Sequence, residues 1–246
     1  MKGVLICGGT GSRLRPLTEI TNKSLLPVYD RPLILYPLDT LLKGGIREIA
    51  IVTGTEHIDQ IAAFLGSGSK FGCEFAFKVQ EKPGGIAQAL GLAEEFAAGE
   101  SLCAILGDNI FFDDLSPAIT NFQSGAHVFL KEVPDPQRFG VATLVQTRDP
   151  RVSEITIATI EEKPKNPKSN LAITGCYLYD NQCFEIIKNL QPSARGELEI
   201  TDVSKAYLGL GKLKASVLQR EWIDAGTFES LFQASQLARE ERLMEK

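Results

Sequence analysis

Apolar residues in the first half of the chain form short runs that alternate with helical patterns. Val4–Cys7 is an apolar run of strand length, and Leu33–Lys43 has the boundaries of a helix because Pro32 precedes it and two glycines follow it. Strands that alternate with helices predict an open, mostly parallel sheet with helices on both faces. The further strands are predicted at Glu48–Thr53, Phe75–Val79 and Leu102–Leu106, and the further helices at Ile58–Leu65 and Ile86–Ala97.

The pattern changes after about Ala126, where strand-like segments become more frequent. We expect a single domain over residues 1–246, in which the second half, from about residue 126, adds a β layer over the edge of the sheet built by residues 1–125. Ligands of such sheets bind beyond the carboxyl ends of the strands. The predicted strands of this half are His127–Glu132, Val141–Val145, Glu154–Ile160 and Ala172–Tyr179, and its predicted helices are Gln182–Leu190, Ile200–Leu208 and Phe228–Glu245.

The composition argues against several classes of partner. The net charge is -5 and no run of Lys or Arg occurs, so binding to nucleic acid is not expected. No stretch approaches the ~18 apolar residues of a membrane-spanning helix, and the N-terminal apolar run ends at Gly8, too early for a signal peptide.

Five cysteines without CxxC spacing indicate buried free thiols in a reducing compartment, so we expect a cytoplasmic protein. With only two histidines, a Ser-His-Asp site or a His-rich zinc site is poorly supported.

A glycine-rich loop, Gly8–Arg13, follows the first predicted strand. Three glycines in four residues allow backbone N–H groups to approach an anion without interference from Cβ atoms, and the Arg13 guanidinium adds donors that suit phosphate. The loop is not a Walker A motif, because no Gly-Lys-Ser/Thr follows, and Leu14 stands where a GxGxxG fingerprint has its third glycine. From this segment alone, a phosphate-binding loop and a plain tight turn both remain open.

Two aspartates that follow apolar segments are candidates for a metal site. Asp108 follows the predicted strand at residues 102–106, and Asp224 follows Trp222-Ile223. Mg²⁺ prefers one or two carboxylates together with substrate phosphates. Each aspartate has a local alternative, an Asx turn at Asp108 and a helix N-cap at Asp224. We interpret the nearby Asp113-Asp114 as the N-cap of the next helix.

Several isolated polar side chains are candidates for holding ligands. Lys23 precedes an apolar run and could neutralise a phosphate, although a lone lysine is usually a solvated surface residue. Glu162 could accept hydrogen bonds from sugar hydroxyls, and Lys163 and Arg195 could hold a phosphate. Taken singly, residues of this kind more often belong to a solvated charge cluster. The Gln80 amide offers a donor and an acceptor, which suits the imide edge of a pyrimidine.

Eight segments together resemble the sugar-1-phosphate nucleotidyltransferases. They are GGTGSRLRPLT, NKSLLPVYDRP, VQEKPGGIAQA, LGDNIF, RFGVA, EEKPKNPKSNLAITGCYLYD, PSARGELEITD and WIDAGT, and they span nearly the whole chain. The combination of PSARGELEITD with VQxxxGGIAQA is specific. The resemblance implies a Rossmann-like, three-layer α/β/α fold and the transfer of a thymidylyl group from dTTP to glucose 1-phosphate, with Mg²⁺ as cofactor.

The resemblance also implies roles for particular residues. The first half of the chain would be the nucleotide-binding half, and the second would bind the sugar phosphate. Position 24 departs from the family pattern. Longer members often have Gln where this chain has Ser24, so the nucleotide contact that the family implies at this position stays open. The implied nucleotide-binding residues are Gly8, Gly9, Gly11, Ser12, Arg13, Gln80 and Gly85. The implied sugar-phosphate-binding residues are Asn109, Gly140, Glu162, Lys163, Ile173 and Arg195. Asp108 and Asp224 would hold the metal, and catalysis would rest on Arg13, Lys23, Asp108, Lys163 and Asp224.

Three other hypotheses remain alongside this one. The first is an enzyme of the same chemistry that uses UTP or another sugar. The second is a catalytically silent nucleotide-sensing subunit, against which the presence of Arg13 and of both aspartates argues. The third is a nicotinamide-dependent oxidoreductase, against which the missing third glycine and the lack of an acidic residue at the end of a second strand argue. For the assembly, the resemblance implies a homotetramer or a homodimer.

Overall fold

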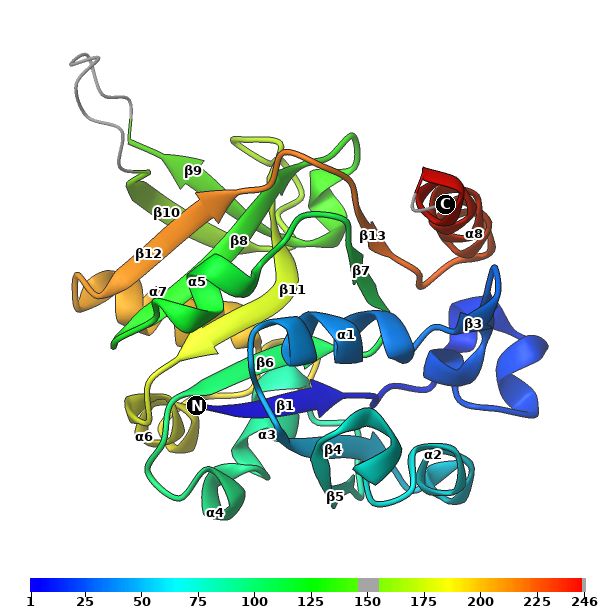
Figure 1. Cartoon of the computed structure of the whole chain (residues 1–246). Helices are drawn as coiled ribbons and strands as arrows, with labels where there is room; N and C mark the ends of the chain where they lie inside the picture. The colour runs from blue at the N-terminus through cyan, green and yellow to red at the C-terminus, as the bar shows by residue number, and fades with distance from the viewer. Residues whose placement is uncertain (146–154, 245–246) are drawn as a thin grey trace.

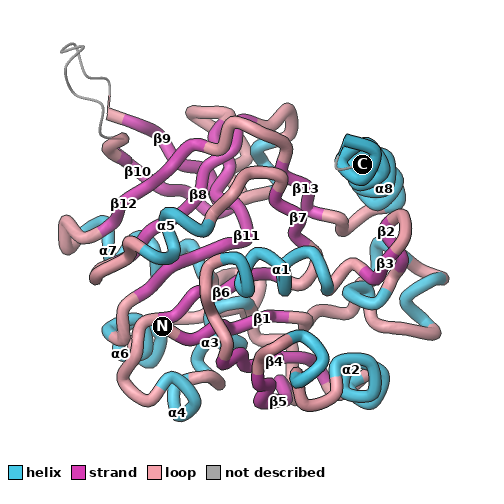
Figure 2. Tube along the Cα trace, in the orientation of Figure 1, coloured by secondary structure: helices cyan, strands magenta, loops and turns pink. Residues whose placement is uncertain are grey.

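The structure of the chain, a computed structural model, describes residues 1–145 and 155–244, and within them a central sheet of nine strands runs through the molecule (Figures 1 and 2). Four parallel strands form its first part, in the order β6-β1-β4-β5. Buried residues follow one another along β1 and β4, as expected of parallel strands covered on both faces. The predicted parallel part of the sheet is confirmed. Its strands are β1 (Lys2–Ile6), β4 (Glu48–Gly54), β5 (Glu74–Gln80) and β6 (Leu102–Leu106).

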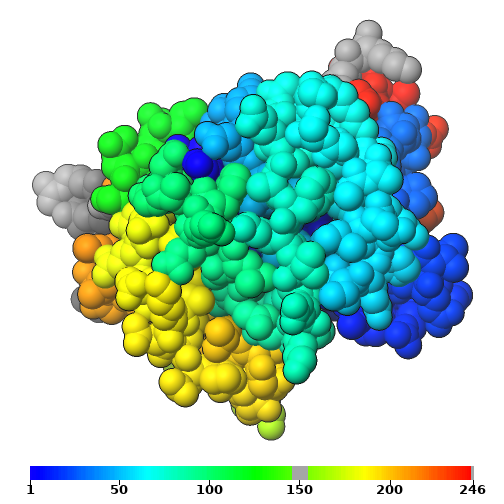
Figure 3. Space-filling view, turned by 90° about the horizontal axis from the view of Figure 1, so that it is seen from below, coloured from blue at the N-terminus to red at the C-terminus, as the bar shows by residue number. Residues whose placement is uncertain are grey.

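Helices cover both faces of the sheet, so the expected three-layer α/β/α arrangement is confirmed. One apolar cluster lies between the sheet and three helices, and a second lies between the opposite face and four others. Figure 3 shows the molecule from below, where the cyan and green segments of the first half lie beside the yellow segment that includes α6. The first group is α1 (Leu35–Lys43), α2 (Ile58–Leu65) and α5 (Ser116–Thr120). The second is α3 (Ile86–Gly91), α4 (Glu94–Ala97), α6 (Gln182–Lys188) and α7 (Ile200–Gly209).

Several predicted helices have different boundaries in the structure. α6 ends two residues before its predicted end and α7 ends one residue after it. α1 begins two residues later than expected, because the N–H groups of Leu33 and Ile34 donate to backbone carbonyls of the preceding segment. The predicted helix at residues 86–97 is two helices, because α3 ends at Gly91 and α4 begins at Glu94. Glycine is a poor helix former, which makes this a natural place for the interruption.

The strands that the second half was expected to add lie at the β6 edge of the parallel part, where they continue the central sheet instead of stacking on it. β11 (Leu171–Tyr179) pairs antiparallel with β6 and with β8 (Ala126–Glu132), and β12 (Leu213–Val217) pairs with the other side of β8. β11 also meets β9 (Gly140–Leu144), which pairs with β10 (Ile157–Glu162). Because β11 is nine residues long, a single strand can join the parallel part to all the others.

Two predicted elements of the second half reach beyond the described residues. The strand expected at 154–160 corresponds to β10, and Glu154 lies outside the described residues. The last predicted helix corresponds to α8 (Phe228–Met244), and Glu245 lies outside them as well. Across residues 1–145 and 155–244, no helix combines the length and the apolar character that crossing a membrane requires.

Two short strands that the sequence pattern does not predict lie beside the end of β6. β7 (Asn109–Phe111) pairs antiparallel with β13 (Trp222–Asp224), and in this register Asp224 lies opposite Asn109. A third apolar cluster joins these strands to α8 and to the small pair formed by β2 (Pro27–Val28) and β3 (Arg31–Pro32). The pairing brings residues far apart in the sequence to one edge of the sheet.

Candidate active site

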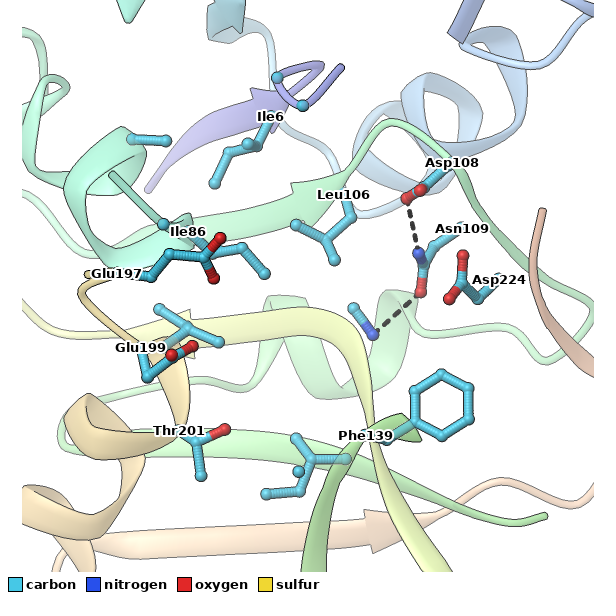
Figure 4. Close-up of a pocket in the computed structure, with 18 of the residues that line it drawn as sticks. Ile6, Ile86, Leu106, Asp108, Asn109, Phe139, Glu197, Glu199, Thr201 and Asp224 are labelled. Atoms are coloured by element: carbon cyan, nitrogen blue, oxygen red, sulfur yellow. Dashed lines mark hydrogen bonds between the residues drawn. The ribbon is translucent and has the colours of Figure 1, made fainter. Parts of the chain in front are cut away.

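A cavity of about 620 Å³ opens beyond the carboxyl ends of β1, β5 and β6. Figure 4 shows part of its lining, with Asp108, Asn109 and Asp224 on one side and Glu197 and Glu199 on the other. The structure brings fourteen of the sixteen predicted site residues to this one cavity. They are Gly8, Gly9, Arg13, Lys23, Gln80, Gly85, Asp108, Asn109, Gly140, Glu162, Lys163, Ile173, Arg195 and Asp224.

The two exceptions, Gly11 and Ser12, do not line the cavity. Gly11 has φ of 59°, and a Cβ there would lie 2.8 Å from Cγ2 of Thr18, whose hydroxyl donates to the Gly11 carbonyl at 2.8 Å. Ser12 opens the short 3-10 turn that carries Arg13 back to the cavity. The turn itself therefore requires Gly11, and a ligand-binding role for either residue stays a prediction.

Gly8 and Gly9 lie next to predicted ligand-binding side chains, where their lack of a Cβ gives those side chains room. A Cβ at Gly8 would lie 2.9 Å from Oε1 of Gln80. Gly9 has φ of 92°, and a Cβ there would lie 3.9 Å from Nζ of Lys23. A side chain at Gly8 would therefore crowd the Gln80 amide, and one at Gly9 would be strained and would face Lys23. The glycines thus serve the cavity as well as the turn.

Asp108 forms an ion pair with Lys23 just after β6, and the two side chains are only 8% and 17% exposed. Burial opposes ionisation of Asp108, yet the charge and the hydrogen bond of Lys23 hold the pKa of that carboxyl below its usual range. Burial likewise opposes the charge on Lys23, but Asp108 raises the pKa of the ammonium above its usual value. Lys23 is therefore a largely buried, charged group of the cavity and not a solvated surface lysine.

Asp224 lies on the same side of the cavity without a comparable partner. Burial, and then the charge of Asp108, raise the pKa of Asp224 to about 6. The cations Lys23, Arg13 and Arg138 act in the opposite direction and do not cancel these effects. Oδ1 of Asp224 is buried and accepts no hydrogen bond from any residue in the described part of the chain. A buried carboxylate in this position is costly unless a cation accompanies it.

The pair Asp108 and Asp224 fits a divalent cation. Both offer hard oxygen ligands, and the unpartnered Oδ1 of Asp224 is the kind of atom that such a cation would satisfy. Within residues 1–145 and 155–244, no group of three or more His, Cys, Asp or Glu could hold a metal. The remaining ligands would therefore be phosphate oxygens and water, a combination that Mg²⁺ prefers.

The alternative helix-capping role of Asp224 is not what the structure shows. α8 begins at Phe228, and Oγ1 of Thr227 accepts the N–H of Ser230 at its start. Of the two aspartates expected to cap the helix after β7, only Asp114 contacts it, by accepting the N–H of Ser116. Asp113 instead accepts the N–H groups of residues 219 and 220, because the segment after β12 passes beside it.

The amide of Asn109 is fixed by three hydrogen bonds. Its Oδ1 accepts from the Gly175 N–H at 3.0 Å and from Nε1 of Trp222 at 2.7 Å, and its Nδ2 donates to Asp108 at 2.9 Å. An amide oxygen has two lone pairs and an amide nitrogen has two N–H groups. One N–H is therefore left for a ligand, and the other bonds orient it.

Glu162 and Arg195 form an ion-pair cluster on the opposite side of the cavity. Nη2 of Arg195 donates to both oxygens of Glu199 at 2.8 Å and to Oε1 of Glu162 at 3.1 Å. Oε2 of Glu162 accepts from the hydroxyl of Thr201. These contacts hold both side chains toward the cavity. Glu162 and Arg195 therefore do not form the solvated surface cluster that was the alternative interpretation.

Lys163, next to this cluster, has an unusual backbone. Its φ is 41°, a conformation that costs energy for a residue with a side chain. Its N–H donates to the Phe139 carbonyl at 2.9 Å, and its Nζ lies 3.6 Å from Glu162. Strained backbone is common at ligand-binding positions, where surrounding contacts hold it in place. The strain places a half-exposed ammonium at the cavity wall.

Arg138, Glu199 and Thr201 also line the cavity, and the sequence did not single them out. Nη1 of Arg138 donates to Asp135 at 2.7 Å, whereas Nη2 is buried without a hydrogen bond to the described residues and lies 3.8 Å from Asp224. All three residues lie in or directly beside segments that carry the resemblance, RFGVA and PSARGELEITD. The motifs therefore covered these positions, but the sequence of a motif does not show which of its side chains point into a cavity.

Ser24, the position that departs from the family pattern, is fully buried and does not line the cavity. A Cβ at Gly107 would lie 2.8 Å from its Oγ, so this hydroxyl packs against the turn that follows β6. The side chain at position 24 therefore faces the protein interior, and the nucleotide contact left open there is not available to it in this conformation.

The parallel sheet, the glycine loop, the carboxylate pair and two groups of cations around one cavity define an α/β protein suited to holding phosphate-bearing ligands. Comparison with known proteins identifies the family within this class. The model of the family described as nucleotidyl transferase matches residues 2–241, and the chain belongs to that family.

The chain is similar to several named members. It is 44% identical over 242 residues to the glucose-1-phosphate thymidylyltransferase of Neisseria meningitidis serogroup A, covering 96% of this chain and 81% of the relative. Identity is 40% over 244 residues to that of Mycobacterium tuberculosis, covering 97% and 82%. A crystal structure from Bacillus anthracis, proposed to be the same enzyme and in complex with a sucrose, is 51% identical with a TM-score of 0.89, covering 97% and 95%. A UDP-glucose pyrophosphorylase complexed with UDP-glucose shares the fold, with a TM-score of 0.83 at 24% identity, covering 98% of each chain.

Proposed function

We propose that this chain transfers a thymidylyl group from dTTP to glucose 1-phosphate, which gives dTDP-glucose and pyrophosphate. The observation that carries the proposal is one cavity with cations from both halves of the chain, Arg13 and Lys23 from the first and Lys163 and Arg195 from the second. Two groups of cations suit two anionic ligands. The relatives at 44% and 40% identity carry the name of this activity.

The first half of the chain binds dTTP in this proposal. The backbone at Gly8 and Gly9 and the guanidinium of Arg13 hold the triphosphate, because these groups lie together where β1 ends. Gln80 and Gly85 read the base at the end of β5. The support is that Gly8 has no Cβ to crowd Oε1 of Gln80, which lies beside the glycine loop.

The second half binds glucose 1-phosphate in this proposal. Lys163 and Arg195 hold its phosphate, and Glu162 together with the remaining N–H of Asn109 binds the hydroxyls. Gly140 and Ile173 form the wall against the sugar. A Cβ at Gly140 would lie 2.7 Å from Oγ1 of Thr201 and 3.4 Å from Oε2 of Glu162, so the bare glycine keeps the Glu162 carboxylate accessible.

The reaction needs no covalent nucleophile from the protein. An oxygen of the sugar phosphate attacks the α-phosphorus of dTTP, the bond from that phosphorus to the bridging oxygen breaks, and pyrophosphate leaves with the electron pair. Correct positioning of two reactants is worth ~7–11 kcal/mol of barrier. Arg13, Lys23, Lys163 and Arg195 provide the cations that oppose the repulsion between the two anions.

We propose Mg²⁺ as the divalent cation, held by Asp108 and Asp224. When bound, it supplies positive charge at the phosphates and lowers the cost of the developing charge. Lys23 already lies against Asp108, so its ammonium is placed to bear on the same phosphates. The ion pair also keeps Asp108 ionised and ready to accept the cation.

A second candidate substrate, UTP, follows from the size of the difference between the bases. Thymine and uracil differ by one methyl group, and a buried methyl is worth ~0.8 kcal/mol. Discrimination on such a group rarely exceeds ~10–200-fold. We therefore expect this site to prefer dTTP but also to accept UTP.

A substrate panel tests the proposal. The purified chain is assayed for pyrophosphate release with glucose 1-phosphate and dTTP, UTP, dATP or dGTP, each with Mg²⁺ and with chelator. We expect dTTP to give the highest kcat/KM, UTP to follow, and chelator to abolish release. Highest activity with a purine nucleotide, or full activity in chelator, would contradict the proposal.

A further inference from the structure

The amide of Gln80 is held in a single orientation at the end of β5. Its Nε2 donates to the carbonyl of Gly85 at 3.1 Å and to Oε1 of Gln88 at 2.7 Å. A backbone carbonyl can only accept, so the end of the amide that faces Gly85 must be the NH₂ group. Both of its N–H groups are then engaged, and the nitrogen has nothing left to offer a ligand.

The oxygen of the same amide is available to a ligand. Oε1 of Gln80 lies 2.9 Å from the position of a Cβ at Gly8, which has none, and it accepts no hydrogen bond from the residues that the structure describes. Gln80 lines the cavity while its side chain is otherwise buried. The amide therefore presents an acceptor, and no donor, beside the glycine loop.

Gln88 supplies one of the two contacts that set this orientation. It lies in α3 and is half-buried. Its side chain occupies the space that a Cβ at Gly84 would fill, since such an atom would lie 2.5 Å from its Cδ. Gly84 is not in the left-handed region, so what it provides is room for the Gln88 side chain.

We infer that Gln88 is a positioning residue that turns the oxygen of Gln80 toward the cavity, and thereby selects a pyrimidine with an N3–H group over cytosine. Thymine and uracil carry a hydrogen at N3 and can donate to Oε1. Cytosine has a lone pair at N3, which an oxygen repels. The inference rests on the proposed function, because it assumes that Gln80 faces the base.

Three substitutions at position 88 separate positioning from packing. Gln88→Glu keeps an acceptor for Nε2 of Gln80, Gln88→Leu removes it, and Gln88→Lys replaces it with a donor that favours the flipped amide. The measured quantity is the ratio of kcat/KM for dTTP to kcat/KM for dCTP, with glucose 1-phosphate fixed. Any effect of charge or folding that acts equally on both nucleotides cancels in this ratio.

We expect Gln88→Glu to keep the parent ratio within about twofold. Gln88→Leu lowers the ratio about three- to tenfold, the value of one neutral hydrogen bond, because the Gly85 carbonyl still favours the original orientation. Gln88→Lys lowers it further and raises kcat/KM for dCTP above that of the parent chain. Proportional losses for both nucleotides in the Leu and Lys variants would overturn the inference, as would loss of selectivity in the Glu variant.

Two further variants complete the test. Gly84→Ala should reproduce the effect of Gln88→Leu, because the added methyl displaces the Gln88 side chain. Gln233→Leu, the same exchange at an exposed position of α8, should leave the ratio unchanged. Failure of the inference and of the proposed function remain distinguishable: a parent chain that does not use dTTP contradicts the function, whereas a selective parent whose Leu, Lys and Gly84→Ala variants stay selective contradicts the inference alone.

Discussion

Asp108 and Asp224 lie on the same side of the cavity, but the charged groups around the two carboxyls differ. Asp108 is paired with Lys23, which holds its pKa low. Asp224 has a buried oxygen without a hydrogen bond to the described residues and a raised pKa. An ionised carboxylate in such an environment lowers the stability of the metal-free protein, and a bound cation removes this cost.

We expect Asp224→Asn to stabilise the metal-free chain at pH 8 while turnover falls by orders of magnitude. The pKa of Asp224 is raised to about 6, whereas an unfolded Asp titrates near ~3.9. Between these values the folded state binds more protons than the unfolded state, so the free energy of unfolding falls as pH rises, and the loss is complete above pH 6. At about 1.4 kcal/mol per pKa unit the gain is on the order of 1–3 kcal/mol.

Denaturant unfolding in chelator, at pH 4 and pH 8, measures this effect. The difference between the variant and the parent chain should be near zero at the lower pH and should appear at the higher. A variant that is less stable than the parent chain at pH 8 would show that Asp224 is stabilised by contacts and not strained by its charge.

The same exchange at Asp108 should have the opposite effect on stability. Asp108→Asn leaves the buried ammonium of Lys23 without its partner, and breaking a buried pair in this way costs about 3 kcal/mol. Turnover should again fall by orders of magnitude. Equal stability changes in the two variants, under the same denaturant conditions, would contradict the assignment of distinct electrostatic roles.

Lys163→Ala should raise the KM for glucose 1-phosphate by about tenfold or more, since a hydrogen bond to a charged group is worth ~1.5–3 kcal/mol. The KM for dTTP should change little. Lys168→Ala is the matched control, because Lys168 is mostly exposed and pairs with Glu161 instead of lining the cavity. Steady-state kinetics with each substrate varied in turn give both constants, and an effect confined to dTTP would refute the assignment of Lys163.

At the scale of secondary structure, local patterns predict most elements but not the contacts between distant ones. Runs such as residues 102–106 and 58–65 define a strand and a helix by their own composition, and the structure has them with those bounds. The three-residue strands β7 and β13 have too little local pattern to be recognised. They exist because they pair with each other, which no window of sequence shows. That pairing places Asp224 opposite Asn109.

Trp222→Phe tests the link between this pairing and the site. Phenylalanine can keep the edge-on packing against Phe139, at 5.2 Å between ring centroids, but it lacks the N–H that donates to Asn109. We expect the free energy of unfolding to fall by about 1–2 kcal/mol and kcat/KM to fall with it, because the Asn109 amide is less firmly oriented. Denaturant unfolding and steady-state kinetics check the two effects. Parent-like values in both would mean that the hydrogen bond does not hold the site.

At the scale of the whole molecule, the two halves share one sheet and one cavity, and their loops are also joined directly. The Leu198 N–H donates to the Gly84 carbonyl at 2.8 Å, and the Ala87 N–H donates to the Leu198 carbonyl at 3.2 Å. The segment with Gln80 and Gly85 is thus fixed against the segment that carries Arg195. These two hydrogen bonds link the proposed nucleotide and sugar-phosphate sites directly.

Most of the site residues implied by the resemblance line the cavity, because they lie in motifs whose members face the same space. The resemblance gave no role to Arg138 or Gln88, although both lie in its motifs, because their roles depend on what they contact: a buried carboxylate for Arg138 and the Gln80 amide for Gln88. The ligand-binding role that it implies for Gly11 stays a prediction, and in the structure Gly11 packs against Thr18. Sequence motifs identify the loops of a site, and the orientation of each side chain requires the three-dimensional structure.

The most direct test of the account is the stoichiometry of the products. The purified chain is incubated with dTTP and Mg²⁺, with and without glucose 1-phosphate, and dTDP-glucose and pyrophosphate are quantified together. Direct attack of one bound anion on the other predicts equal amounts of both products when glucose 1-phosphate is present and no pyrophosphate when it is absent. Pyrophosphate release from dTTP alone, or no dTDP-glucose from the complete mixture, would contradict it.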